Sequence, residues 1–111
     1  MTATYNLVCP QATTFNFQFR PQTDGVNWDL AGYTATMTVR PFLGSSTTTL
    51  LATTANGKIV INTVADTVTV TFSATETNIK PESYVYDLVL TSGTVTRLLE
   101  GKFVVTGGVT V

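Results

Sequence analysis

The sequence predicts an all-β fold, and three observations lead to that prediction. Threonine and valine alternate through much of the chain, as in strands with one face buried and the other in water. Turn residues recur at short intervals, at Asp24-Gly25, Gly44-Ser45-Ser46, Asn56-Gly57 and Ser92-Gly93. No long helical pattern separates the strands, so no helices are available to cover a parallel sheet. We therefore expect two antiparallel sheets packed face to face.

Four segments show the strand pattern most clearly. Their alternating apolar residues are Phe15, Phe17 and Phe19; Tyr33, Ala35, Met37 and Val39; Val68, Val70 and Phe72; and Tyr84, Tyr86, Leu88 and Leu90. Weaker strand patterns fill the gaps, at residues 4–9, 26–29, 48–53, 58–62 and 95–105. The prediction is an immunoglobulin-like antiparallel β-sandwich of about eight strands.

One departure from strand structure is expected after the strand that ends at Phe72. Ser73-Ala-Thr-Glu76 has the pattern of a capping box, in which the serine hydroxyl and the glutamate close the start of a helix. Pro81 then stops any continuation. The sequence therefore predicts one short helical turn at residues 74–79.

The hairpin at Ser92-Gly93 allows two registers. A two-residue turn pairs Leu88 with Arg97, which then reaches water from the core side of the sheet. A three-residue turn with a bulge instead shifts the pairing and turns Leu98 inward. We prefer the first register, because it also buries Leu99 and the alternate apolar residues that follow it.

Length and charge restrict the class of protein. The chain has 111 residues, 43% hydrophobic and 12% charged, so we expect one ordered domain over residues 1–111. The chain has six basic residues, none adjacent to another, and seven acidic ones. This balance disfavours nucleic acid as a partner. Neither a membrane-spanning apolar run nor a signal-peptide pattern is present, so we expect folding in a cytosol and no membrane partner.

Residues that could carry catalysis are scarce. Histidine is absent and Cys9 is the single cysteine, so we expect no disulfide, zinc cluster or histidine-activated nucleophile. The carboxylates are dispersed, and an enzyme would need the fold to bring a pair together, for example Asp29 with Asp87. The glycines form no phosphate-binding loop. The prediction is a non-enzymatic protein without catalytic residues, cofactor, metal or small-molecule substrate.

Candidate contact residues lie at strand ends and on strand faces. Phe42 and Leu43 follow a strand end, and if they are exposed they mark a site for a protein partner. Trp28 either closes one end of the sandwich or stands exposed as a further contact. Threonines alternate at residues 34–38 and 67–71, and a flat threonine ladder can bind ice or sugars. We favour a solvent face or a protein contact surface, because threonine suits the wet face of any strand.

Five segments together have the pattern of a family of phage proteins. They are Ala12-Thr-Thr-Phe15, residues 29–40, Tyr84-Val-Tyr-Asp-Leu88, Arg97-Leu-Leu-Glu-Gly101 running into Val104-Val105, and the final Gly-Val-Thr-Val. In order and spacing they resemble the N-terminal domain of upper baseplate and fibre-adaptor proteins of tailed bacteriophages. The resemblance spans nearly the whole chain, although Cys9-Pro10 stands where that pattern usually has a glycine-containing turn.

The resemblance implies a structural subunit of a phage particle, at the tail or baseplate, assembled in the bacterial cytoplasm. Its partners would be other virion proteins and copies of itself. We expect contacts at the sheet edges and at residues 106–111, including Val109, Thr110 and Val111. A head decoration protein is a close alternative. A carbohydrate-binding module is another, and it would need exposed aromatic rings in one plane, for which the candidates are Tyr5, Trp28 and Phe42.

Overall fold

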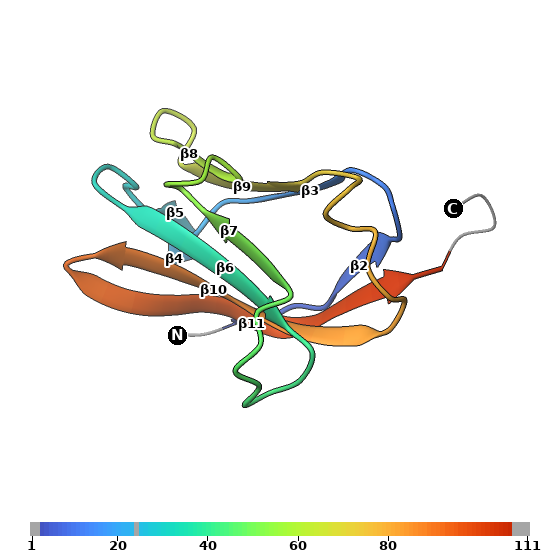
Figure 1. Ribbon diagram of the computed structural model, residues 1–111. Coiled ribbons are helices and arrows are strands. Elements are labelled where there is room, and N and C mark those ends of the chain that lie inside the picture. Colours follow the sequence, from blue (N-terminus) through green and yellow to red (C-terminus); the bar gives the residue numbers. More distant parts are fainter. Residues whose placement is uncertain (1–2, 24, 108–111) are drawn as a thin grey trace.

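The computed structural model describes residues 3–23 and 25–107, and these form two main β-sheets and one small hairpin (Figure 1). The strands are β1 (Ala3–Thr4), β2 (Leu7–Pro10), β3 (Phe15–Phe19), β4 (Gln22–Thr23), β5 (Val26–Asn27), β6 (Thr34–Arg40), β7 (Leu50–Thr53), β8 (Ile59–Asn62), β9 (Thr67–Phe72), β10 (Ser83–Ser92) and β11 (Thr94–Thr106). The six-stranded sheet has the order β1-β11-β10-β6-β7, with β2 also paired to β11. The second sheet has the order β3-β9-β8, and β4 pairs with β5 alone.

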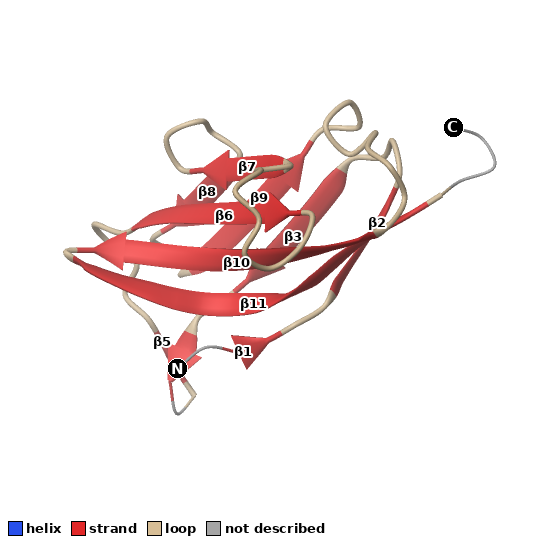
Figure 2. Cartoon of the chain, turned by 60° about the horizontal axis from the view of Figure 1, so that its bottom comes forward, coloured by secondary structure: helices blue, strands red, loops and turns tan. Residues whose placement is uncertain are grey.

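The two main sheets pack against each other, with β3, β8 and β9 forming the upper layer in Figure 1. Seen from another side, the strands of this layer cross those of the larger sheet (Figure 2). Phe15 of β3 meets Phe103 of β11 edge to face, with ring centroids 5.2 Å apart, and Phe72 of β9 meets the same ring at 6.2 Å. These contacts join the layers into one core.

The alternation of residues along β6, β9 and β10 produces the expected buried face. The buried side chains are Ala35, Met37, Val39, Val68, Val70, Phe72, Tyr84, Tyr86, Leu88 and Leu90. Their neighbours in sequence face outward and are mostly half-buried or exposed. The predicted all-β sandwich is thus confirmed, while its immunoglobulin-like pattern of connections stays a prediction.

The N-terminal strand expected at residues 4–9 is divided, and its pairing differs from the prediction. Both β1 and β2 run parallel to β11, whereas the other pairings between strands are antiparallel. The break falls at Tyr5 and Asn6, which leave the ladder between the two short strands. At this break the Tyr5 amide donates to the Glu100 carbonyl at 2.9 Å, and the Lys102 amide donates to the Asn6 side chain at 3.0 Å.

A glycine and a tyrosine hold this break in place. Gly101 has a φ of 156°, and a Cβ added there would collide with the backbone carbonyl of Tyr5. Tyr86 lies opposite Gly101 in the β10–β11 ladder, and its hydroxyl donates to the same Tyr5 carbonyl. The Tyr5 ring stacks on Phe17 of the second sheet, with centroids 5.6 Å apart. The N-terminal segment therefore connects the edge of one sheet to the inner face of the other.

The preferred register of the β10–β11 hairpin is wrong. Ser92 pairs with Thr94 around Gly93, and a bulge follows, so Leu88 faces Leu99 and Val89 faces Arg97. Arg97 is exposed on the outer face instead of lying beside the core tyrosines. Leu98 and Leu99 are both half-buried against the core, because the bulge places two residues opposite one. The alternative with a bulge describes this hairpin better.

Residues 74–77 form a turn, and the described residues contain no helix. The capping pattern is nevertheless present, since the Ser73 amide donates to the Glu76 carboxylate at 3.0 Å and the Glu76 amide to the Ser73 hydroxyl at 3.3 Å. A single helical hydrogen bond runs from the Thr77 amide to the Ser73 carbonyl. The Thr77 hydroxyl then donates to the Thr13 carbonyl at 2.6 Å, which ties the turn to the β2–β3 connection. The segment is thus one capped turn and not the short helix expected at 74–79.

The close approach at Gly101 generates a stability prediction. Gly101→Ala should reduce the free energy of unfolding by about 2–4 kcal/mol, because the new methyl group must displace the Tyr5 backbone and its hydrogen bonds. Urea unfolding followed by tryptophan fluorescence measures the change. Gly107→Ala is the control, since its Cβ would meet only Pro81 at an ordinary 3.5 Å. Equal effects of the two substitutions would contradict the assignment.

Tyr86 generates a pH prediction. Burial, with a smaller contribution from Tyr5, raises its pKa to about 12, and the side chain is only 4% exposed. An unfolded tyrosine titrates near pH 10, so the folded state is favoured by the higher pKa of Tyr86 only where this side chain is protonated. That contribution to the free energy of unfolding is complete below about pH 10 and is lost as the pH rises toward 12. The loss amounts to about 2–3 kcal/mol in the free energy of unfolding.

Urea titrations from pH 8 to pH 12 test this directly. Tyr86→Phe should remove most of the alkaline decline, leaving the smaller share from Tyr84, whose pKa burial also raises. An unchanged decline in the phenylalanine variant would show that the Tyr86 hydroxyl is not the buried group described here.

Candidate interaction surface

The connection between β6 and β7 projects two apolar side chains into solvent. Residues 42–45 form a turn in which the Ser45 amide donates to the Phe42 carbonyl at 3.1 Å. Gly44 occupies the third position with a φ of 88°, which glycine adopts without strain. Phe42 is 63% exposed and Leu43, beside it, is 89% exposed. We call this segment the 42–45 turn.

The 42–45 turn is fixed to the end of β6. The Arg40 guanidinium donates to the Ser45 carbonyl at 3.0 Å, and the Thr47 amide donates to the Ser45 hydroxyl at 3.1 Å. Arg40 itself lies in the ladder opposite Val85 of β10. The exposed side chains are therefore presented by a backbone with defined hydrogen bonds, which lowers the entropy lost when a partner binds.

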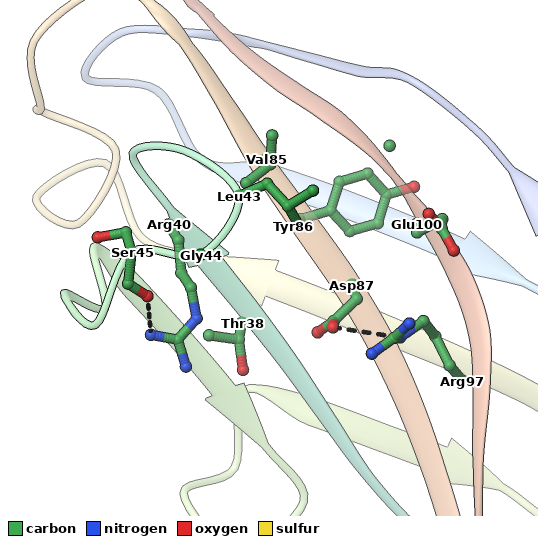
Figure 3. Close-up of a pocket in the computed structure, with 11 residues that line it drawn as sticks. Thr38, Arg40, Leu43, Gly44, Ser45, Val85, Tyr86, Asp87, Arg97 and Glu100 are labelled. Carbon is green, nitrogen blue, oxygen red and sulfur yellow. Dashed lines mark hydrogen bonds and ion pairs between the residues drawn. The ribbon is translucent and has the colours of Figure 1, made fainter.

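A pocket of about 300 Å³ lies between this turn and the outer face of the larger sheet (Figure 3). Its walls are Leu43, Gly44 and Ser45 from the turn, Thr38 and Arg40 from β6, Val85, Tyr86 and Asp87 from β10, and Arg97, Glu100 and Gly101 from β11. The bulge in β11 is the reason that Arg97 reaches this face. Strands far apart in the sequence thus contribute to one shallow surface.

The pocket carries charges of both signs. Asp87 lies in the middle, opposite Thr38 on one side and Glu100 on the other. The Arg97 Nε atom approaches an Asp87 carboxylate oxygen at 3.4 Å, and both side chains remain accessible to solvent. Such a pair contributes little to stability, of the order of 0–1 kcal/mol. Its groups can therefore exchange this contact for polar groups of a partner at small cost.

The other predicted contact residues do not join this surface. Trp28 is half-buried against the core, with its ring 6.3 Å from that of Tyr33. Trp28 follows the β4–β5 hairpin, and its amide donates to the Pro21 carbonyl. The strand predicted at residues 26–29 is shorter in the structure, where β5 covers only Val26–Asn27. Trp28 precedes β6 and Phe42 follows it, so the seven residues of this strand lie between them. Val109, Thr110 and Val111 lie outside the described residues.

The aromatic side chains considered for a sugar site are also dispersed. Tyr5 stacks on Phe17, Trp28 packs against Tyr33, and Phe42 projects from the 42–45 turn. Phe17 stacks in turn on Phe19 at 5.6 Å. Each of the three candidates thus has different neighbours, which disfavours the common plane that a carbohydrate-binding module would need.

The outward threonines of β9 form hydrogen bonds with polar side chains of the neighbouring strand β3. The Thr71 hydroxyl donates to the Asn16 side chain at 2.7 Å, and the Gln18 side chain donates to Thr69 at 2.9 Å. Both are cross-strand pairs between β3 and β9. This network explains the polar face through sheet pairing, without a ligand.

The groups considered for catalysis lie apart. Asp29 accepts a hydrogen bond from the Ala31 amide before β6 begins, whereas Asp87 faces Thr38 and pairs with Arg97. Burial raises the pKa of the Cys9 thiol despite hydrogen bonds with Thr77 and Thr13 that lower it, which keeps the thiol protonated.

Metal binding and membrane crossing are two further possibilities for the described residues. Among them no three histidine, cysteine or acidic side chains gather closely enough to hold a metal ion. Residues 3–23 and 25–107 also contain no helix long and apolar enough to cross a membrane.

Sequence reasoning missed the pocket because it depends on the hairpin register. Only the register with the bulge at residue 98 places Arg97 on the outer face and brings Glu100 directly opposite Asp87. Glycine at 101 was a usable signal, since a glycine inside a strand often marks a bulge or a close backbone approach. Phe42 and Leu43 were identified from sequence, and their exposure agrees with a contact role that stays a prediction.

No protein-family model and no curated protein matches this chain.

The attachment of the 42–45 turn generates a prediction. Arg40→Ala should lower the free energy of unfolding by about 1 kcal/mol, because one charged hydrogen bond is lost at a half-buried site. Amide exchange at Ser45 and Thr47 should accelerate, which NMR measures residue by residue. Arg97→Ala is the control, since it removes the other arginine of the pocket, which pairs with Asp87 on the neighbouring strand. Unchanged exchange at Ser45 in Arg40→Ala would show that Arg40 does not hold the turn.

Proposed function

We propose that this chain is a non-enzymatic structural protein of a tailed phage particle, a tail, baseplate or fibre-adaptor subunit that acts through protein contacts. The observation that carries the proposal is the pair of exposed apolar side chains on a fixed turn. Leu43 lines a pocket of mixed charge, and the exposed Phe42 precedes it in the same turn. Apolar and charged groups are combined in this way in protein interfaces, where an apolar centre has a polar rim.

The chemistry of the pocket favours a protein partner over a small substrate. Arg40 and Arg97 can meet carboxylates, while Asp87 and Glu100 can meet basic groups, so a folded partner with both charges fits. The resemblance of the strand motifs to phage baseplate and adaptor domains supplies the setting. Many copies in a particle would convert individually weak contacts into a stable assembly.

A head decoration protein would use the same kind of surface, and the position in the particle separates the two. Mass spectrometry of separated heads and tails from purified particles should find the chain in the tail fraction. Its presence on heads alone would favour decoration, and its absence from particles would contradict the phage proposal.

The 42–45 turn generates a prediction about assembly. Exchanging Phe42 and Leu43 for serine should leave the free energy of unfolding within about 0.5 kcal/mol, because both side chains are exposed. Incorporation into particles, measured by quantitative mass spectrometry after complementation, should fall at least about tenfold if these side chains are central contacts.

The matched control exchanges Val64 and Val95 for serine. These valines are also exposed, at 95% and 67%, and neither lines the pocket. Similar incorporation of both double variants would contradict a special role for the 42–45 turn.

A further inference from the structure

The sheet edges of this protein differ in how they are protected. β7 has β6 on one side, and its other side is covered by Asn56. The Asn56 side chain accepts from the Thr53 amide at 3.0 Å and donates to the Leu51 carbonyl at 3.2 Å. One side chain thus takes the place of a neighbouring strand, and β7 is closed to further pairing.

Two other edges carry different obstacles. β2 ends in Pro10, which has no amide hydrogen to donate to a new strand. Beside β3, the Tyr5 ring stacks on Phe17. These features match the ways in which proteins prevent unwanted pairing of exposed edges.

β8 has none of these protections. Its residues Ile59, Val60 and Ile61 include no charge and no proline, and its only partner within the described chain is β9. The Thr71 amide donates to the Lys58 carbonyl at 2.9 Å, which sets the phase of the β8–β9 ladder. Backbone groups alternate in direction along a strand, so those of Ile59 and Ile61 point to the free edge.

The side chains of β8 also suit a partner strand. The other outward residues of this sheet, Asn16, Gln18, Thr69 and Thr71, are polar, whereas Val60 is apolar and 59% exposed. Lys58 is the charge nearest to this edge, and its ammonium group is 2.8 Å from the Glu76 carboxylate. Partial burial would raise the Glu76 pKa, but hydrogen bonds from Lys58 and Ser73 outweigh it and lower the pKa. Lys58 is therefore held by its own chain.

We propose that β8 pairs antiparallel with β8 of a second copy of this chain, about a twofold axis at Val60. In this register Ile59 of one copy faces Ile61 of the other, and both contribute backbone groups that already point outward, giving about four hydrogen bonds. Val60 faces Val60 of the second copy at the closely spaced position of the ladder. Lys58 faces Asn62, so no like charges oppose each other.

The register also continues the core pattern across the axis. Ile59 is buried and Ile61 is half-buried on the inner face, so apolar residues meet apolar residues there. The two three-stranded sheets become one continuous six-stranded sheet. Pairing over the five residues 58–62 of each copy is weak by itself, and many copies held near each other would strengthen it.

This pairing deepens the proposed function, since it names one contact of the structural subunit. Only the role of the pairing in a particle rests on the proposed function. The purified protein tests the pairing without any particle. A missing dimer would therefore leave the particle experiment standing, and absence from particles would leave the dimer standing.

Oxidative crosslinking of Val60→Cys is the direct test. At the twofold position the Cα atoms lie about 4.5 Å apart, within the range that a disulfide spans. The control is Val8→Cys in β2, because Val8 is 61% exposed and Val60 is 59% exposed. Cys9 is buried in both proteins. We expect disulfide-linked dimers of Val60→Cys to form about tenfold faster than those of Val8→Cys, owing to the local concentration that pairing provides.

A second change separates strand pairing from random collision. Ile61→Pro, added to Val60→Cys, removes an amide that faces the free edge and leaves the β8–β9 hydrogen bonds intact. Its crosslinking rate should fall to that of Val8→Cys, with urea unfolding confirming that the domain is folded. Equal rates for Val60→Cys and Val8→Cys would overturn the proposal. Undiminished crosslinking of the folded proline variant would overturn it as well.

Discussion

The backbone carbonyl of Tyr5 is the point on which the closure of the sandwich depends. It rests against Gly101 where no side chain fits, and it accepts the hydroxyl of Tyr86 from inside the core. The same residue donates its amide to Glu100 and places its ring on Phe17. One short segment therefore joins the parallel N-terminal strands, the central hairpin and the second sheet, and loss of any of these contacts weakens the others.

This closure explains why the functional features lie where they do. With β1 and β2 on one side of β11, the long strands β6, β10 and β11 present a continuous outer face, and the 42–45 turn borders the pocket on it. The second sheet contributes only three strands, and its free edge at β8 lies away from that turn in sequence and in sheet order. The molecule thus has two separate candidate contact regions, one of side chains and one of backbone groups, which fits the subunit with more than one neighbour that we propose.

Alternation along single strands was predictable from sequence because it depends on local geometry. Met37, Val70 and Leu88 are buried as their spacing indicates, whereas the exposure of Phe42 was left open by the sequence. The parallel pairing of β1 and β2, the bulge at Leu98 and the pocket at Asp87 were not predictable in this way. The parallel pairing depends on contacts between residues about a hundred positions apart, such as Asn6 with Lys102. The bulge and the pocket depend on how neighbouring strands are paired, which no pattern within one strand specifies.

Native-state hydrogen exchange tests the central claim most directly, namely that the Tyr5 segment is an integral part of the fold. The amides of Tyr5 and Lys102 donate to Glu100 and to the Asn6 side chain, so both should exchange only through global unfolding, as core amides of β10 do. Their protection should fall with added urea along the same slope as that of the core amides. Exchange of Tyr5 and Lys102 as rapid as that of the exposed amides in the 42–45 turn would contradict the account.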